Sequence, residues 1–366
     1  MDHPQLATFD ELLRTTLNTI INANLSDLHW IWASLPVSDG GLGVRRVSTL
    51  ALPAFLSSYA STSSTQLAIL ASCQPTADPL QALYFTKWVN NFGPAPTSPS
   101  DGKQSAWDAP GIAAERSLIQ TSLSTHRDKA VFLAASAPHS GAWLSALPLA
   151  SCGLHLDDEA VRVGAALRLG LPLCGAHLCT CGEQVDIWGS HAAVCKNAPA
   201  STIRHFAIND IIARSITAAG APVSKEPTGL AKAVAKRPDG VTQIPWRGGK
   251  ALAWDATISC TLAASYIVAS AAQAGSAAEL AAANKTNKYS FLQPDYIFQP
   301  VAFESLGTCS SSTADFIAEI GSKISAKSGD PRETYYLWQR LAVCIQRFNA
   351  ILLHQSFSEV FEEPDG

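Results

Sequence analysis

The sequence predicts a chain of mixed fold class, with a helical N-terminal half followed by a small Cys/His module and an α/β core. Apolar residues recur at helical spacing through the first segment. Four cysteines then fall within 22 residues, and strand-like runs alternate with helical ones after them. With 366 residues, the chain is long enough for about two or three domains with cores of their own.

The composition is that of a folded chain, because 47% of the residues are hydrophobic and only 15% are charged. No apolar run reaches the roughly 18 residues of a membrane span, and the acidic start lacks the apolar stretch of a secretory signal. The net charge of -4 argues against indiscriminate nucleic-acid binding. Residues 225–250 nevertheless predict a basic surface, with two acids against six basic residues: Lys225, Lys232, Lys236, Arg237, Arg247 and Lys250.

The N-terminal half is expected to be helical over residues 1–91. Apolar residues spaced three or four apart predict its first helix: Leu6, Phe9, Leu13, Leu17 and Ile20. The glycines and proline of residues 30–44 predict a loop there. Residues 92–111, rich in Pro, Ser and Gly, predict a linker.

A helical connector is expected over residues 112–173. Its paired acids Asp157 and Asp158 could suggest a polymerase metal site, but they stand immediately before a helical run. Side chains of this kind stabilise a helix N-terminus, so we interpret both as acids of a first helical turn.

Cysteines and histidines cluster in residues 174–200. Because the sequence shows no secretory signal peptide, this cluster predicts a zinc module and not a set of disulfides. If residues 190–196 are helical, His191 and Cys195 share one face and can reach one ion together with Cys179 and Cys181. The single-residue gap between the first two cysteines is tighter than usual, so Cys174 or His177 is an alternative ligand. Four protein ligands imply a structural role for the zinc ion.

Residues 201–353 are expected to form the α/β core, followed by a tail over 354–366. Predicted helices are 201–219, an alanine-rich segment ending near Tyr289, and a last helix with Asp330 as N-cap and Pro331 at its first position. Predicted strands are 239–245, 251–258 and 300–305. Glu304, within the last of these strands, is interpreted as a paired or edge carboxylate.

Two acids of this core are candidates for holding Mg²⁺ or Mn²⁺. Asp239 follows a proline, and Asp255 lies 16 residues later in an apolar strand. Strand alternation places Asp255 and Thr257 on one face, with Leu252, Trp254 and Ile258 on the other. Converging carboxylates that hold a divalent ion are the basis of metal-dependent phosphodiester cleavage, and this order is similar to the PD-(D/E)XK arrangement of nucleases.

The departure from that arrangement is Thr257, which stands where a lysine is expected. Lys285 and Lys288 lie three apart on the following helix, so either could supply the missing positive charge. Glu226, before the first strand, is a candidate additional acid.

Taken in order, the Cys/His cluster, 237–240 (Arg-Pro-Asp-Gly), 254–257 (Trp-Asp-Ala-Thr) and 285–289 (Lys-x-x-Lys-Tyr) resemble the C-terminal region of non-long-terminal-repeat retrotransposon proteins that carry a restriction-like endonuclease. Segments 33–44 and 50–55 resemble the region after the polymerase palm in these elements, so residues 1–91 would be a thumb-like segment. The resemblance covers about 28–350, with the linker poorly matched.

The resemblance implies an endonuclease that nicks target DNA to prime reverse transcription. Asp239 and Asp255 would then bind Mg²⁺ or Mn²⁺, Lys285 or Lys288 would be the migrated lysine, and Cys179, Cys181, His191 and Cys195 would form the zinc knuckle. DNA is the expected partner, element RNA is a second candidate partner, and a nuclear location follows from the DNA alone.

The sequence contains no Tyr/Phe-x-Asp-Asp polymerase motif, so this chain is not expected to copy RNA by itself. A polymerase domain is expected on a full-length parent protein, and the chain would be a fragment, a degraded copy or a host-retained remnant. The alternative function is a catalytically inactive, zinc-containing module that binds nucleic acid. The negative net charge and Thr257 favour that alternative.

Overall fold

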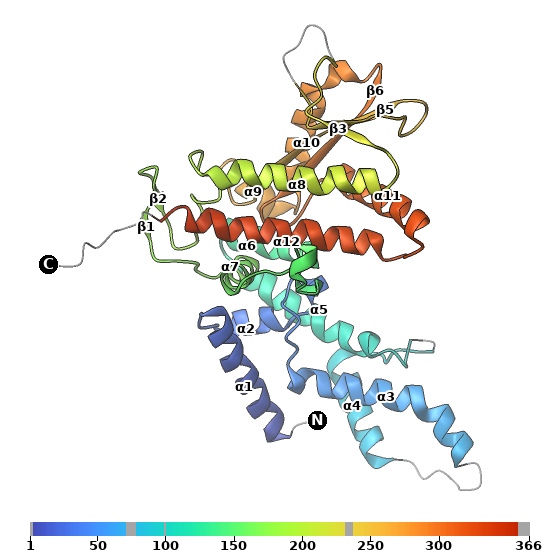
Figure 1. Ribbon diagram of the computed structural model, residues 1–366. Coiled ribbons are helices and arrows are strands. Elements are labelled where there is room, and N and C mark those ends of the chain that lie inside the picture. Colours follow the sequence, from blue (N-terminus) through green and yellow to red (C-terminus); the bar gives the residue numbers. More distant parts are fainter. Residues whose placement is uncertain (1–2, 71–77, 99, 231–236, 358–366) are drawn as a thin grey trace, which may run out of the picture. The chain divides into compact units, whose positions relative to one another are not determined.

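The computed structural model describes residues 3–70, 78–98, 100–230 and 237–357, and these fall into two compact units, Met1–Leu123 and Ser124–Gly366. The first unit is helical, as predicted (Figure 1). Its elements are α1 (Pro4–Ile21), α2 (Asp27–Ser34), η1 (Val37–Asp39), α3 (Val47–Ile69), α4 (Pro79–Phe92) and α5 (Gln104–Ser122).

Two predictions for the first unit need correction. Helix α2, whose N-terminus is capped by the Ser26 hydroxyl accepting the N–H of His29, continues to Ser34, so the first five residues of the predicted loop 30–44 are helical. Helix α5 begins at Gln104, inside the predicted linker 92–111, and contains Pro110. Burial explains the second difference, because Trp107 packs in the core of this unit with Leu52, Leu56 and Trp88.

The second unit holds all the sequence-predicted site residues. Its helices are α6 (His126–Ala135), η2 (Ala142–Ser145), η3 (Ala150–Cys152), α7 (Asp158–Leu169), α8 (Pro199–Ala218), α9 (Ile267–Ala272), α10 (Ser276–Lys288), η4 (Ser290–Leu292), α11 (Ser311–Ser328) and α12 (Glu333–His354). Its strands are β1 (His177–Leu178), β2 (Gln184–Val185), β3 (Val223–Lys225), β4 (Gly240–Thr242), β5 (Ala251–Ser259) and β6 (Tyr296–Glu304).

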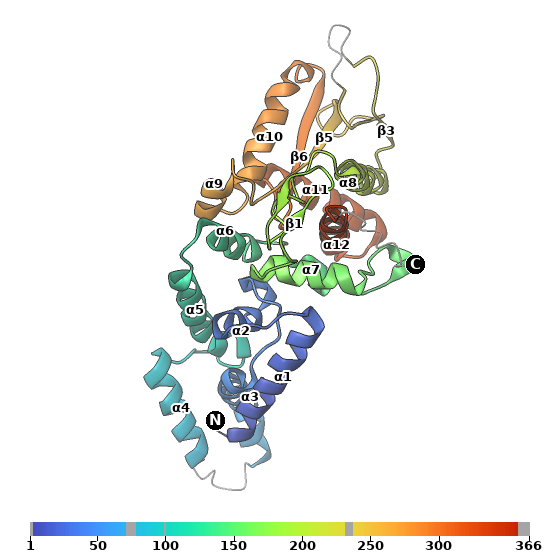
Figure 2. The ribbon, with the colours of Figure 1, turned by 90° about the vertical axis from the view of Figure 1, so that its left-hand side faces the viewer.

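Four strands form the central sheet in the order β3-β4-β5-β6. Strands β3, β4 and β5 are antiparallel neighbours, whereas β5 and β6 run parallel over nine residue pairs. Helix α10 lies on one face of the sheet, and α8, α11 and α12 lie on the other (Figure 2). Strand β5 is therefore covered on both faces, which explains its nearly continuous apolar sequence.

The predicted alternation along β5 is confirmed. Leu252 and Trp254 belong to the large core under α8, α11 and α12, whereas Ala253 packs with Tyr289 and Leu292 on the α10 side. Asp255 therefore also faces α10, where only 3% of the residue is exposed.

Several boundaries differ from the predicted ones. Asp157 caps α7, as expected, because its Oδ1 accepts the N–H of Ala160 at 2.7 Å. Asp330 does not cap the last helix, which begins at Glu333. Its carboxylate instead binds the backbone and side chain of Arg332, a local turn that competes with helix initiation. Gly275 divides the alanine-rich segment into α9 and α10.

Glu304 ends β6, an edge strand of the central sheet, and is fully buried. Its Oε1 accepts the N–H of Ala278 in the first turn of α10, at 3.1 Å. None of the described helices combines the length and the apolar character that a membrane span requires.

Candidate functional site

The Cys/His module is built on the short β1–β2 hairpin. The N–H of Cys179 donates to the carbonyl of Glu183, and the N–H of Gly182 donates to the carbonyl of Cys179, both at 2.8 Å. Gly182 has a φ of 90°, a left-handed conformation that lets the turn close within a few residues. The turn thereby brings the thiols of Cys179 and Cys181 to one side of the hairpin.

Four side chains converge beside this hairpin. Nε2 of His191 lies 3.1 Å from Sγ of Cys181, and Sγ of Cys195 lies 3.8 Å from Sγ of Cys179. All four candidate ligand atoms lie within 4.8 Å of one another. Three thiolates and one imidazole at this spacing could hold a metal such as zinc in tetrahedral coordination.

His191 and Cys195 come together through a different backbone conformation from the predicted one. Residues 191–194 form turns and not a helix, with N–H groups donating three residues back, as from Val194 to His191. The helical geometry proposed for 190–196 is therefore wrong, although the two side chains still converge.

The two alternative ligands point elsewhere. Sγ of Cys174 lies 3.5 Å from the carbonyl oxygen of Asp186. The ring of His177 stacks on Phe357, and its Nε2 lies 2.9 Å from the hydroxyl of Ser356. His177 therefore links the module to the residues that follow α12.

The environment of Cys179 favours its ligand form. Burial alone would raise the pKa of this thiol, but hydrogen bonds from the backbone and side chain of Cys181 and from Thr180 lower it to about 6. Burial raises the pKa of its neighbour Cys195. The thiolate of Cys179 therefore forms readily near neutral pH, and a bound cation would stabilise the thiolate of Cys195.

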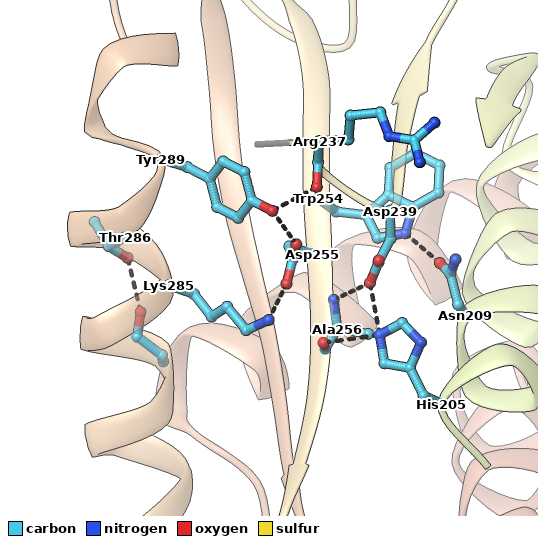
Figure 3. A network of polar contacts seen from close by, with 11 residues as sticks. His205, Asn209, Arg237, Asp239, Trp254, Asp255, Ala256, Lys285, Thr286 and Tyr289 are labelled. Carbon is cyan, nitrogen blue, oxygen red and sulfur yellow. Dashed lines mark hydrogen bonds and ion pairs between the residues drawn. The ribbon is translucent and has the colours of Figure 1, made fainter. Parts of the chain in front are cut away.

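The candidate nuclease residues lie around β5 (Figure 3). Lys285 on α10 forms an ion pair with Oδ1 of Asp255, whose side chain is only 4% exposed. The hydroxyl of Tyr289 donates to Oδ2 of the same carboxylate at 2.6 Å and lies 2.5 Å from the carbonyl oxygen of Arg237. Burial, and then the carboxylate, raise the pKa of Tyr289, so its hydroxyl remains a donor.

The two candidate lysines have different surroundings. Lys285 reaches Asp255, whereas the ammonium of the exposed Lys288 lies 4.5 Å from the ring centroid of Tyr289. Thr257, where a lysine is expected, pairs in register with Ala302 of β6. The geometry thus puts a lysine beside Asp255 from a helix that lies 30 residues farther along the chain.

Asp239 lies just before β4 and binds the backbone of β5. Its Oδ2 accepts the N–H of Ala256 at 2.6 Å and lies 3.1 Å from Nε2 of His205 on α8. The hydrogen bond to Asp239 raises the pKa of His205, against the effect of burial, and the carbonyl of Ala256 adds to the rise. In Figure 3 the carboxylates of Asp239 and Asp255 lie on opposite sides of β5, each with partners from a different helix.

The backbone between these acids is fixed by a buried tryptophan. Nε1 of Trp254 donates to Oδ1 of Asn209 at 2.7 Å. A Cβ at Gly240 would come within 2.1 Å of the same indole ring, so only glycine fits opposite Trp254. The close contact of β4 and β5 therefore depends on this glycine.

Glu226 is not brought to the carboxylates. Its side chain is exposed, and it meets Asp239 through its own N–H, which donates to the carbonyl of Asp239 at 2.9 Å. In the predicted basic segment, Lys225 pairs with Asp210, whereas Arg247 and Lys250 are exposed. Lys232 and Lys236 lie outside the described residues.

Sequence reasoning missed His205 and assigned no role to Tyr289. A signal for the first was present, because His205 and Asn209 stand four apart on an otherwise largely apolar helix face. Within the described residues, the Cys/His module is the one group of three or more metal-ligating side chains that lie within 4.8 Å of one another. Neither a protein-family model nor any curated protein matches this chain.

Proposed function

We propose that this chain is a metal-dependent DNA endonuclease with a structural zinc module. The observation that carries the proposal is the contact of Lys285 with Asp255. A nuclease of the PD-(D/E)XK type needs two acids and a lysine, and α10 supplies the lysine that β5 lacks at Thr257. The position of Asp239 at the end of β4, the strand that pairs with β5, supports the same interpretation.

A bound cation would replace the partners that the two acids have in this structure. Asp239 and Asp255 each hold a cationic or titratable nitrogen against a carboxylate oxygen, from His205 and Lys285 respectively. Carboxylates are the ligands that Mg²⁺ or Mn²⁺ takes in proteins, and those of Asp239 and Asp255, on opposite sides of β5, would have to move to share one ion. Such an ion activates water and neutralises charge on the scissile phosphate. Lys285 would stabilise the charge that develops there, and Tyr289 would orient Asp255.

The wider setting proposed is that of a retroelement. The nuclease would nick target DNA for target-primed reverse transcription, with the polymerase on a full-length parent protein, DNA and element RNA as partners, and a nuclear location. The order of the zinc module and the two acids supports this proposal, as does the helical character of the first unit.

A second candidate function is a catalytically inactive module that binds nucleic acid. One observation favours it: both oxygens of Asp255 are already engaged, by Lys285 and by Tyr289. A stable internal network of this kind could be all that remains of a former active site.

Nicking of supercoiled plasmid by zinc-loaded protein separates the two candidates. We expect nicking with Mg²⁺ or Mn²⁺, none when the ion is omitted or chelated, and none from Asp255→Ala or the isosteric Asp255→Asn. Circular dichroism would verify that both variants fold. Plasmid that stays intact with the wild-type protein, while a gel shift still detects binding, would exclude the enzyme and leave the binding module.

A further inference from the structure

A groove lies between helix α12 and the chain segment that precedes α7. It is lined by two stretches, 145–154 and 332–340, and neither of them contributes to the central sheet. Its volume of about 680 Å³ falls within the usual range of about 300–1,000 Å³ for ligand sites. The groove is therefore separate from the candidate nuclease residues, none of which lines it.

Hydrogen bonds from α12 hold one wall of the groove in place. Nε2 of Gln339 donates to the carbonyl of Ser145 at 2.7 Å. Farther along the helix, Nη2 of Arg347 donates to the carbonyls of Gly153 and His155 at 2.8 and 3.0 Å. Both ends of the segment are thereby tied to one helix, so the groove is formed before any ligand binds.

Large apolar and aromatic side chains of the groove are open to solvent. Leu147, Leu149 and Tyr335 line it and are 68%, 49% and 47% exposed. The ring of Tyr335 lies 6.4 Å from that of Tyr336, with the two planes inclined by 54°. A group of exposed apolar side chains of this kind marks a surface that another molecule covers.

The same groove carries positive charge. Arg332 and Arg340 line it, and Arg347 follows about two turns beyond Arg340 on α12. Arg332 forms an ion pair with Asp330, whereas Arg340 and Arg347 pair with no carboxylate among the described residues. Nε of Arg340 is buried and has no hydrogen-bond partner in that part of the chain. A buried donor of this kind requires an acceptor, which an anionic ligand supplies.

We propose that this groove binds single-stranded nucleic acid, with bases against Tyr335 and Tyr336 and with phosphates at Arg340 and Arg347. The inference rests on the proposed function, because it names the surface that would hold the nucleic-acid partner. Proteins that bind single strands combine cations that follow the backbone with aromatic rings on which bases stack. A duplex hides the faces of its bases, so the groove should prefer single strands.

The test measures strand binding and not cleavage. Fluorescence anisotropy gives the affinity of the zinc-loaded full chain for a labelled oligothymidylate, an oligouridylate and a duplex of the same length, without added Mg²⁺ or Mn²⁺. The variants are Tyr335→Ala, Tyr335→Phe, Arg340→Gln and Glu333→Gln. Arg162→Ala, at a partly exposed arginine of α7 outside the groove, is the matched control. Circular dichroism would verify that each variant folds.

We expect Tyr335→Ala to weaken the binding of both single strands by about tenfold, the effect of losing one stacked base, whereas Tyr335→Phe should bind as wild type. Arg340→Gln should weaken binding and reduce the slope of log affinity against log salt by about 0.7, the contribution of one phosphate. Glu333→Gln should strengthen binding, because Glu333 is the one acid among the described residues that line the groove. The control should behave as wild type.

Photo-crosslinking locates the strand independently of the variants. A strand that contains iodouracil is irradiated on the wild-type protein, and mass spectrometry identifies the modified residues. Adducts should form on Tyr335 or Tyr336. Adducts confined to other residues, together with unchanged affinity in Tyr335→Ala and Arg340→Gln, would overturn the assignment of the groove and leave the nuclease proposal intact.

Three further results would also overturn the inference, each with its own meaning. A labelled glutamate-rich peptide that binds wild type and not Arg340→Gln, when no strand binds, would assign the groove to an acidic protein partner. A wild-type protein that nicks plasmid but binds no single strand would remain a nuclease without this surface. A protein that neither nicks plasmid nor binds any strand would overturn the proposed function as well.

Discussion

Lys285 on α10 and Asp255 on β5 form an ion pair across one face of the central sheet, although 30 residues separate them in the sequence. Lys288, one turn farther along, contacts the ring of Tyr289 instead. Replacing Lys288 is therefore a matched control for replacing Lys285.

We expect Lys285→Ala to slow plasmid nicking by about a hundredfold or more, the usual effect of removing a group that stabilises developing charge. Lys288→Ala should change the rate by less than about threefold, since its side chain is exposed and the cost of losing such a surface contact is small. Initial nicking rates at saturating metal provide the comparison. Equal losses in both variants would mean that the contact with Asp255 has no special role.

Gly240 is predicted to tolerate no side chain. In Gly240→Ala the added methyl group would overlap the ring of Trp254, so β4 must move away from β5. We expect a loss of about 1–3 kcal/mol in the free energy of unfolding, the range found for overpacked cores. Urea denaturation followed by tryptophan fluorescence measures it. Gly175→Ala is the control, because a Cβ there meets nothing within 4 Å; comparable losses in the two variants would contradict the explanation.

Zinc content tests the Cys/His module directly. The purified protein should contain about one zinc ion per chain, as four convergent ligands imply. Cys181→Ser should remove most of it, whereas Cys152→Ser, at an exposed cysteine outside the cluster, should retain it. Elemental analysis after gel filtration gives the ratio. Full zinc content in the first variant would show that another residue, such as Cys174, completes the site.

His205 should make stability depend on pH. Its pKa is raised in the folded state, chiefly by Asp239, so its stabilising effect is complete below the unfolded pKa of about 6.5 and is lost as the pH rises through the folded value. The difference in unfolding free energy between wild type and His205→Gln should therefore be larger near pH 6 than near pH 9, both approximate. Denaturation of zinc-loaded protein without Mg²⁺ or Mn²⁺ measures it. A difference that grows with pH would be inconsistent with this ion pair.

Local patterns predicted the parts of the core that depend on neighbouring residues. Strand periodicity predicted the two faces of β5, and Asp157 was predicted to stabilise a helix N-terminus, where it is the N-cap. The four residues of the Cys/His cluster were also evident from their density, although the predicted helix around His191 was not found. In these cases the side chains that interact lie within 16 residues of one another or repeat with a fixed period.

What the sequence could not supply were contacts made across the fold. The choice between Lys285 and Lys288 depends on how α10 lies over the sheet, and His205 meets Asp239 only because α8 covers the other face. Helix α5 formed in spite of Pro110, because Trp107 is buried and its carbonyl accepts the indole N–H of Trp88. In these cases tertiary packing outweighs local preference.

The parallel pairing of β5 with β6 also affects the chain during its synthesis. Strand β5 leaves the ribosome before its partner, and until residues 296–304 follow, one side of an apolar nine-residue strand has unpaired N–H and C=O groups. An edge of this kind can pair with another nascent chain. A chaperone that covers this strand would therefore reduce aggregation. Slow translation of the segment between β5 and β6 would increase it.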